Sequence, residues 1–569
     1  MGIHRRGLLV AAGATAAVAS AARAATDQGP SKAWVQGGGG KYGQSLESLR
    51  RYVEQHRADF GLPGLTLCVV DADGYAGFIT SGWADVERRE PVSGGHVFQI
   101  GSITKSMVAL CIYRLVQAGK IRLDQDVREI LPEVQIDTTE KVTLARIVDH
   151  SAGLPGDSPL FPRATDGRLW LGYKPHSHWS YSNLGYDLLG KVIERVEGKT
   201  FERVCEEQVL RPLGMGRAFG AIRSEDRALY ATGYSPYHGE RPYPRRGRLD
   251  QAPWLDVTFA AGCVAATPQE MAKYARWVMA AARGKGSPLL TDELAKRYTE
   301  GSVDAPGWAK DAKYGAGWAT VKVDGRSMLH HTGGMVAFSS SIHMDPEAGI
   351  ACFASTNVGS TGYRPRAITA YACQLFRAAR EGGKSPTPAP TAVKVEAPEK
   401  SAGRFTAAGG DGIELKPGGP SGLQLAHKGG SAMLEAAGED AFLAHDPRFD
   451  RHVLALERKD GKIVAAWYGE TEYAADPAKL RGPAKAELRA LSGRYDNDDP
   501  WLGTFRVYAR PTGLFLGATT ALTQLESGAW RTAEDDWNPE RIWFDAPLNG
   551  RTQRLSYSGT DFLRRDDRA

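Results

Sequence analysis

The chain has 569 residues, of which 42% are hydrophobic and 24% charged, with a net charge of +5. This length exceeds one ordinary core, so we expect two to four domains, and no Lys/Arg block of the kind that binds nucleic acid occurs. The six cysteines are widely scattered and mostly lie in apolar runs, which predicts buried thiols rather than a disulfide framework.

Residues 1–24 have the pattern of an export signal. Arg5 and Arg6 form a basic start, an Ala-rich apolar run follows, and small residues precede a predicted cleavage site after Ala24. The paired arginines resemble a twin-arginine signal, and an ordinary secretory signal is the alternative. We therefore expect a periplasmic or secreted protein. No other segment is apolar for long enough to span a bilayer, so no stable membrane span is expected after cleavage.

Residues 40–380 predict one α+β domain. Runs rich in β-forming residues occur in pairs near both ends, and segments with helical spacing lie between them. The expected hairpins cover residues 65–85 and 338–357, and the expected helices cover residues 102–119, 183–198 and 267–284. This order favours a central antiparallel sheet flanked by helices.

The remaining chain predicts a linker and two copies of one small domain. Residues 381–399 are Pro-rich and polar, as linkers are. Three landmarks then recur at offsets of 90, 91 and 90 residues: AGRF with SGRY, SGLQL with TGLFL, and GETEY with GTDFL. Short alternating strands with turn signals indicate two antiparallel, lipocalin-like β-barrels, at residues 400–483 and 484–569.

Ser102 and Lys105 form the first candidate catalytic pair. Positions three apart at a helix start are neighbours, about 5–6 Å between Cβ atoms. A buried Lys can lose its proton and activate a serine, while free N–H groups at the helix start stabilise an oxyanion. On this spacing alone, the alternative is a capping Ser with a solvated Lys.

Two later motifs supply matching chemistry. Tyr181 and Asn183 stand just before a predicted helix, where a phenol can transfer protons and an amide can orient a Lys or bind a carbonyl. His331, Thr332 and two adjacent glycines occur in a predicted strand, and glycines allow a substrate to approach the strand edge. The alternatives are a capping Ser or Asn, a core Tyr and a structural His.

The ordered motifs S-x-x-K, Y-x-N and H-T-G resemble those of the serine β-lactamases and penicillin-recognising hydrolases. The likeness is to the class C-like branch of D,D-carboxypeptidases, D-aminopeptidases and esterases, and it covers residues 42–380. The family implies a β-lactamase/transpeptidase-like fold. No G-x-S-x-G motif supports an α/β-hydrolase instead.

The resemblance also implies a role for each matching residue. Ser102 would be the acylated nucleophile, with Lys105 and Tyr181 completing the catalytic set. The main-chain N–H groups of Ser102 and Gly334 would form the oxyanion hole. Substrate binding would fall to Asn183, His331, Thr332 and Gly333. Whether Lys105 or Tyr181 takes the first proton is left open.

His331 stands where most β-lactamases carry Lys, and a neutral imidazole gives less grip on a carboxylate. The sequence thus predicts an exported peptidase or amidase for D-amino-acid peptides, cell-wall peptides among them, or a small-ester esterase. The alternatives are a class C-type β-lactamase and a penicillin- or muropeptide-binding protein with little turnover. The expected partner is a small molecule or peptide, without nucleic acid, cofactor or metal. The oligomeric state is left open.

Overall fold

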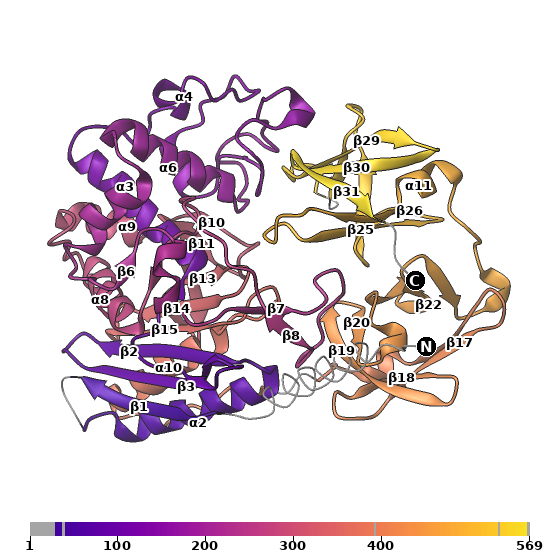
Figure 1. Cartoon of the computed structure of the whole chain (residues 1–569), viewed down its shortest axis with the longest axis horizontal. Helices are drawn as coiled ribbons and strands as arrows, with labels where there is room; N and C mark the ends of the chain where they lie inside the picture. Colours follow the sequence, from indigo (N-terminus) through magenta and orange to yellow (C-terminus); the bar gives the residue numbers. More distant parts are fainter. Residues whose placement is uncertain (1–28, 37–39, 392–393, 533–534, 566–569) are drawn as a thin grey trace, which may run out of the picture. The chain divides into compact units, whose positions relative to one another are not determined.

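The computed structural model describes residues 29–36, 40–391, 394–532 and 535–565 (Figure 1). The predicted signal at residues 1–24 lies outside them. The described chain divides into two compact units, each treated separately below. The first unit comprises residues up to Gly156, Tyr173–Tyr237 and Arg246–Ala389, and the second comprises Asp157–Gly172, His238–Arg245 and the chain from Pro390 onward.

The first unit is built on the predicted antiparallel sheet. In spatial order its strands are β1 (Ser31–Gln36), β3 (Ala76–Asp85), β2 (Gly64–Asp71), β15 (Ile350–Thr356), β14 (Ser339–Asp345), β13 (Arg326–Gly334), β12 (Ala319–Val323), β11 (Lys313–Gly315) and β10 (Gly301–Asp304), with β4 (Glu90–Pro91) pairing with β3. The predicted hairpins are β2–β3 and β14–β15, which confirms both. Strand β15 joins the two hairpins by pairing with β2. Strands from the beginning and the end of the domain's sequence therefore lie side by side at the centre of the sheet.

Helices cover this sheet because its strands are apolar on both faces. Leu65, Leu67 and Val69 of β2 share a core with α2 and α10, while α8 packs on the same strands. The helices are α2 (Gly43–Phe60), α3 (Thr104–Gln117), α4 (Val127–Ile130), α5 (Leu144–Val148), α6 (Asn183–Glu197), α7 (Phe201–Cys205), α8 (Pro268–Ala281), α9 (Asp292–Thr299) and α10 (Arg366–Glu381). None of the helices in the described residues combines the length and apolarity that crossing a bilayer requires.

Two short sheets complete the first unit. One contains β5 (Phe98–Gln99), β9 (Ala265–Ala266) and β6 (Ala218–Phe219), and the other contains β7 (Tyr234–Pro236) and β8 (Leu249–Gln251). Helix α6 begins as expected, because the Ser182 hydroxyl accepts a hydrogen bond from Gly185 N, and it ends at Gly198 in the left-handed region. Helix α8 has Thr267, the first residue of the expected range, as its N-cap, but it ends at Ala281, before the end of that range at Gly284.

The second unit contains the two predicted antiparallel barrels, each closed by pairing of its first and last strands. Barrel 1 comprises β16 (Gly403–Ala407), β17 (Gly412–Pro417), β18 (Leu423–His427), β19 (Gly430–Gly438), β20 (Ala441–Ala444), β21 (Leu454–Lys459), β22 (Lys462–Tyr468) and β23 (Thr471–Ala474). After α11 (Ala486–Leu491), barrel 2 comprises β24 (Gly493–Asp496), β25 (Thr504–Arg510), β26 (Gly513–Leu516), β27 (Thr520–Gln524), β28 (Trp530–Thr532), β29 (Arg541–Leu548), β30 (Arg551–Tyr557) and β31 (Thr560–Arg565). The repeated sequence landmarks fall on the first, third and eighth strands of both barrels.

Two segments from the middle of the sequence also belong to the second unit. In segment 157–172, Arg163 forms ion pairs with Asp545 and Asp561 of barrel 2, and Trp170 Nε1 donates to Pro539 O. In segment 238–245, Arg241 and Arg245 pair with acidic residues of barrel 1. These contacts bridge more than 150 residues of sequence, which no local pattern predicts.

The predicted linker is packed at both ends. Ala389 O accepts a hydrogen bond from the Tyr52 hydroxyl inside the first unit. Val395 N donates to Ser421 O, and the Val395 side chain is buried in the barrel 1 core. The Pro-rich composition therefore marks a connection between units but not a freely extended chain.

Candidate active site

Ser102 lies in a 3₁₀ turn, η1 (Gly101–Ile103), directly before α3. The turn needs glycine at position 101, where φ is +55° and a Cβ would lie 2.8 Å from Gly334 N. The turn thus holds Ser102 against the end of β13. Ser102 precedes the α-helix itself, whereas the sequence predicted it on the first helical turn.

Lys105 occupies the first turn of α3 and is fully buried. Its Nζ lies 3.2 Å from Ser102 Oγ, 2.6 Å from Asn183 Oδ1 and 2.8 Å from Ala261 O. The ring of Tyr181 lies 4.9 Å from the same nitrogen. The structure therefore gathers Ser102, Tyr181 and Asn183, the other three residues singled out in the first and second motifs, around the Lys105 amine.

The partners of Lys105 suit both protonation states of the amine. As an ammonium it can donate one hydrogen bond to each of three oxygens. As a neutral amine it can donate to Asn183 Oδ1 and Ala261 O, which accept in this arrangement. The lone pair is then directed at the Ser102 hydroxyl, which is the geometry of a base receiving the serine proton.

Helix α6 contacts the Lys105 amine directly through one residue and holds it indirectly through a second. Asn183, its first residue, contacts Lys105, and Asp187 lies one turn further along. Asp187 Oδ1 accepts a hydrogen bond of 2.9 Å from Ala261 N, and Ala261 O in turn accepts from Lys105. Asp187 therefore fixes the backbone that holds the lysine. Asp187 belongs to none of the three sequence motifs, although its i+4 spacing from Asn183 places both on one helix face.

Tyr181 is surrounded by aromatic rings. The His150 ring lies 4.4 Å away, Trp308 6.0 Å and Trp179 6.4 Å, measured between ring centroids. His150 Nδ1 accepts a hydrogen bond from Ser182 N, and burial holds the pKa of His150 well below its usual value. A neutral, fully packed imidazole thus supports one side of the Tyr181 ring.

His331 lies on β13 and is fully buried. Its Nδ1 lies 2.7 Å from Thr332 O. Because a carbonyl oxygen can only accept, Nδ1 carries the proton and donates. Nε2 then accepts a hydrogen bond of 2.9 Å from the Tyr314 hydroxyl. Burial, followed by the charge of Lys105, lowers the pKa of His331 to about 3. The ring is neutral, as expected, but both of its nitrogens are bonded inside the protein. It has no donor left for a substrate in this arrangement.

The glycines after Thr332 bring β13 against the nucleophile turn. A Cβ at Gly333 would lie 1.8 Å from Ile100 O, so only glycine fits there. The neighbouring Gly334 also lies close to the turn, since a Cβ at Gly101 would come within 2.8 Å of Gly334 N. The end of β13 that carries the Gly334 N–H therefore lies beside Ser102. An oxyanion hole formed by the main-chain N–H groups of these two residues requires this arrangement.

Arg364 is a further candidate that sequence reasoning missed. A Cβ at Gly334 would lie 2.1 Å from its Nη2, so the guanidinium packs directly on the proposed oxyanion-hole residue. Its Nη1 donates to Ser339 Oγ and Tyr363 O, and burial lowers the pKa of Arg364, which nevertheless stays cationic. The short motif YRPR gives no signal of this role.

Comparison with known proteins places these residues in a family context. The family described as Beta-lactamase matches residues 49–376. Penicillin-binding protein 4 of Amycolatopsis lactamdurans is 26% identical, over 56% of this chain and 86% of that protein. Esterase EstB of Burkholderia gladioli is 33% identical, and the match covers 29% of this chain and 48% of the esterase. The octameric penicillin-binding protein homologue from Pyrococcus abyssi shares the fold, with a TM-score of 0.55 and 24% identity over 75% of this chain and 99% of that chain.

Proposed function

This chain belongs to the Beta-lactamase family of serine hydrolases, and on that premise we propose that it cleaves peptides or amides containing D-amino acids, or small esters, through an acyl-enzyme on Ser102. The observation that carries the proposal is the position of Lys105. Its buried amine contacts the Ser102 hydroxyl while two other oxygens hold it in place. A buried lysine with this set of partners has the geometry of a serine activator.

The proposed reaction has two stages. Ser102 Oγ attacks the substrate carbonyl and its proton passes to Lys105 or Tyr181. The carbonyl oxygen becomes an oxyanion that accepts hydrogen bonds from the N–H groups of Ser102 and Gly334. Collapse of this intermediate breaks the scissile bond, and the leaving amine or alcohol takes up the proton. Water then attacks the acyl-enzyme, and Ser102 recovers its proton as the acid product forms.

The surroundings of the site support substrates with a partly apolar acyl group and no carboxylate. Trp308 and Trp179 stand beside Tyr181, and the imidazole of His331 is neutral. Aromatic side chains bind apolar groups at little entropic cost. This favours an aminopeptidase, amidase or esterase over an enzyme that depends on a lysine in the third motif.

Arg364 favours a second candidate. Its guanidinium packs on Gly334, beside the proposed oxyanion hole, and a fixed cation there suits a substrate carboxylate. D-Ala-D-Ala peptides and β-lactams both carry such a group. Within the first proposal Arg364 therefore favours a D,D-carboxypeptidase, and a class C-type β-lactamase activity is the alternative.

A hydrolysis panel distinguishes the two candidates. The substrates are D-aminoacyl amides, D-Ala-D-Ala peptides, p-nitrophenyl esters and a chromogenic cephalosporin. The first proposal expects kcat/KM for a D-aminoacyl amide or an ester to exceed that for the cephalosporin. A preference for the cephalosporin supports the alternative, and no hydrolysis of any of the four substrates contradicts both.

Export is proposed with this activity, because D-amino-acid peptides are cell-wall components and residues 1–24 match a signal. The test is N-terminal sequencing of the protein recovered from a bacterial periplasm. Mature protein is expected to begin at Ala25. Full-length protein confined to the cytoplasm contradicts the proposal.

A further inference from the structure

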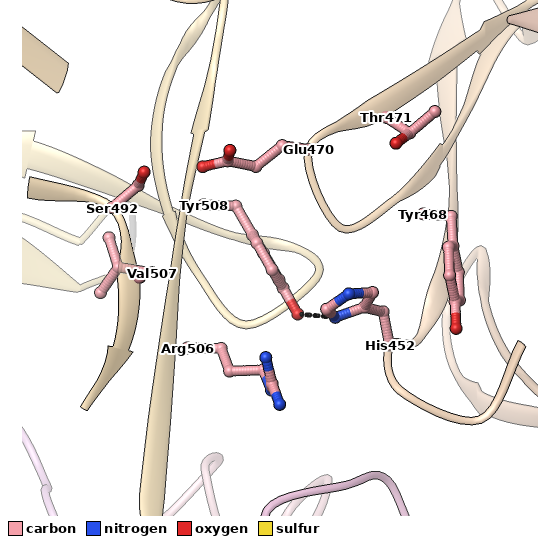
Figure 2. A pocket seen from close by; sticks show the side chains of 9 residues that line it. His452, Tyr468, Glu470, Thr471, Ser492, Arg506, Val507 and Tyr508 are labelled. Carbon is pink, nitrogen blue, oxygen red and sulfur yellow. Dashed lines mark hydrogen bonds between the residues drawn. The ribbon is translucent and has the colours of Figure 1, made fainter. Parts of the chain in front are cut away.

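The second unit contains a hollow of about 330 Å³ lined by both barrels (Figure 2). Barrel 1 contributes His452, which precedes β21, and residues around the β22–β23 turn, and barrel 2 contributes residues of β25 and the start of β24. The lining residues are His452, Tyr468, Glu470, Thr471, Ser492, Gly493, Arg506, Val507 and Tyr508. This volume lies at the low end of the range for small-molecule sites, roughly 300–1,000 Å³.

Three hydrogen-bonded contacts join barrel 1 to barrel 2 around the hollow. His452 Nδ1 lies 2.8 Å from the Tyr508 hydroxyl, and Glu470 Oε1 accepts a hydrogen bond of 2.8 Å from Ala509 N. Arg510 donates to Gly469 O at the tip of the β22–β23 turn. The hollow is therefore preformed, which lowers the entropic cost of binding a ligand.

Arg510 makes the third contact rigid. Its side chain is almost fully buried and lies 4.8 Å from the Trp467 ring and 4.6 Å from the Phe515 ring. Burial lowers the pKa of Arg510 to about 10, so it stays cationic at neutral pH. Because its charge is desolvated, the Arg510 side chain is held in one geometry. It thereby fixes the β22–β23 turn, which forms part of the hollow.

The hollow presents charges of both signs. Figure 2 shows the Glu470 carboxylate toward one end of the Tyr508 side chain and the Arg506 guanidinium toward the other. A simple anion would be repelled by Glu470, and a simple cation by Arg506. Arg506 Nε donates to Glu240 O within the second unit. A zwitterion matches the two charges, with its ammonium at Glu470 and its carboxylate at the Arg506 guanidinium.

We propose that this hollow binds a free amino acid or short peptide with an unblocked ammonium and an unblocked carboxylate. The two tyrosine rings that flank His452 supply apolar surface for the ligand side chain or backbone. The site belongs wholly to the second unit, whereas Ser102 belongs to the first. The proposal therefore does not rest on the catalytic function, although a peptidase would release ligands of this class.

The test uses the full chain with Ser102→Ala, so that no probe is consumed, and titration calorimetry with alanyl-alanine in its D,D and L,L forms. N-acetyl-alanyl-alanine lacks the ammonium, and alanyl-alanine amide lacks the carboxylate. We expect the unblocked dipeptide to bind at least about tenfold more tightly than either blocked form, or about 1.4 kcal/mol. If no binding of the unblocked dipeptide is seen at millimolar concentration, the proposal is overturned.

Charge variants then assign the binding to this hollow. Glu470→Gln keeps an acceptor for Ala509 N but should bind the N-acetyl and free dipeptides equally. Arg506→Gln should bind the amide and the free acid equally. If either variant fails to fold, Thr471→Trp fills the hollow from an exposed turn position and should abolish binding. Dipeptide selectivity that survives in Thr471→Trp belongs to another part of the chain and contradicts the assignment.

Discussion

Lys105 Nζ lies 3.2 Å from Ser102 Oγ, and the two residues belong to consecutive turns of different geometry. Ser102 is the middle residue of η1, and Lys105 is the second residue of α3. The change from a 3₁₀ turn to an α-helix brings side chains three apart onto one side. The Tyr181 ring lies over the same amine, 4.9 Å from its nitrogen, so the three side chains meet at one place.

Lys105 and Tyr181 are expected to act as one unit. Lys105→Ala or Tyr181→Phe should each lower kcat/KM by roughly 10²–10⁴-fold, the usual range for loss of a proton-transfer group. The double variant should lose only a few-fold more than the worse single variant. The measurement is kcat/KM of all four proteins with one ester. Losses that multiply would assign the two residues to separate steps.

Asp187 is expected to position Lys105 through Ala261. Asp187→Leu removes the acceptor for Ala261 N and should lower kcat about tenfold with little change in KM, equivalent to about 1.4 kcal/mol. Asp187→Asn keeps an acceptor and should restore most of the rate. Lys191→Ala, at an exposed position of the same helix, is the matched control. Equal losses in the Leu and Asn variants would exclude the positioning role.

Arg364 is expected to select for a substrate carboxylate. Arg364→Gln should lower kcat/KM for a D-Ala-D-Ala peptide about tenfold and for a neutral ester less than about twofold. Lys285→Gln, a charge removed at an exposed site, is the control and should change neither. A uniform loss on both substrates would make Arg364 a structural support for Gly334 only.

The sequence predicts the strongly patterned parts of this fold well. The β2–β3 and β14–β15 hairpins, α6 with its Ser and Gly ends, and the duplicated barrels all follow from local periodicity or repetition. Strands β10 to β12 were missed because they are short and their alternation is weak. Segments 157–172 and 238–245 join the barrels through long-range ion pairs, which leave no local pattern.

The candidate site divides in the same way. Ser102, Lys105, Tyr181 and Asn183 belong to motifs with fixed spacing, so sequence alone brings them together. Ala261 contributes only its main chain, which no side-chain pattern reports. The internal bonding of His331 depends on Tyr314, seventeen residues earlier on a separate strand.

Acid should destabilise the protein through buried histidines. Burial lowers the pKa of His331 and of His343 to about 3, against about 6.5 in an unfolded chain. Between these values the unfolded chain binds protons and the folded chain does not. The free energy of unfolding should therefore fall as pH drops from about 6.5 to about 3, by about 1.4 kcal/mol per pH unit for each histidine.

His343 allows this to be measured outside the active site. It contacts Thr369 and lies on β14. His343→Asn should remove the contribution of one histidine to the slope of the free energy of unfolding against pH. The measurement is denaturant unfolding at several pH values. His178→Asn, at an exposed position, should leave the dependence unchanged. An unaltered slope in His343→Asn would show that this ring does not resist protonation.

The central claim is that Ser102 is the acylated nucleophile. The most direct measurement is mass spectrometry of the whole protein after reaction with a fluorophosphonate or a penicillin, followed by peptide mapping. We predict one adduct per chain, on the peptide that carries Ser102, and none in Ser102→Ala. An unmodified wild-type protein, or an adduct on any other serine, would contradict the account.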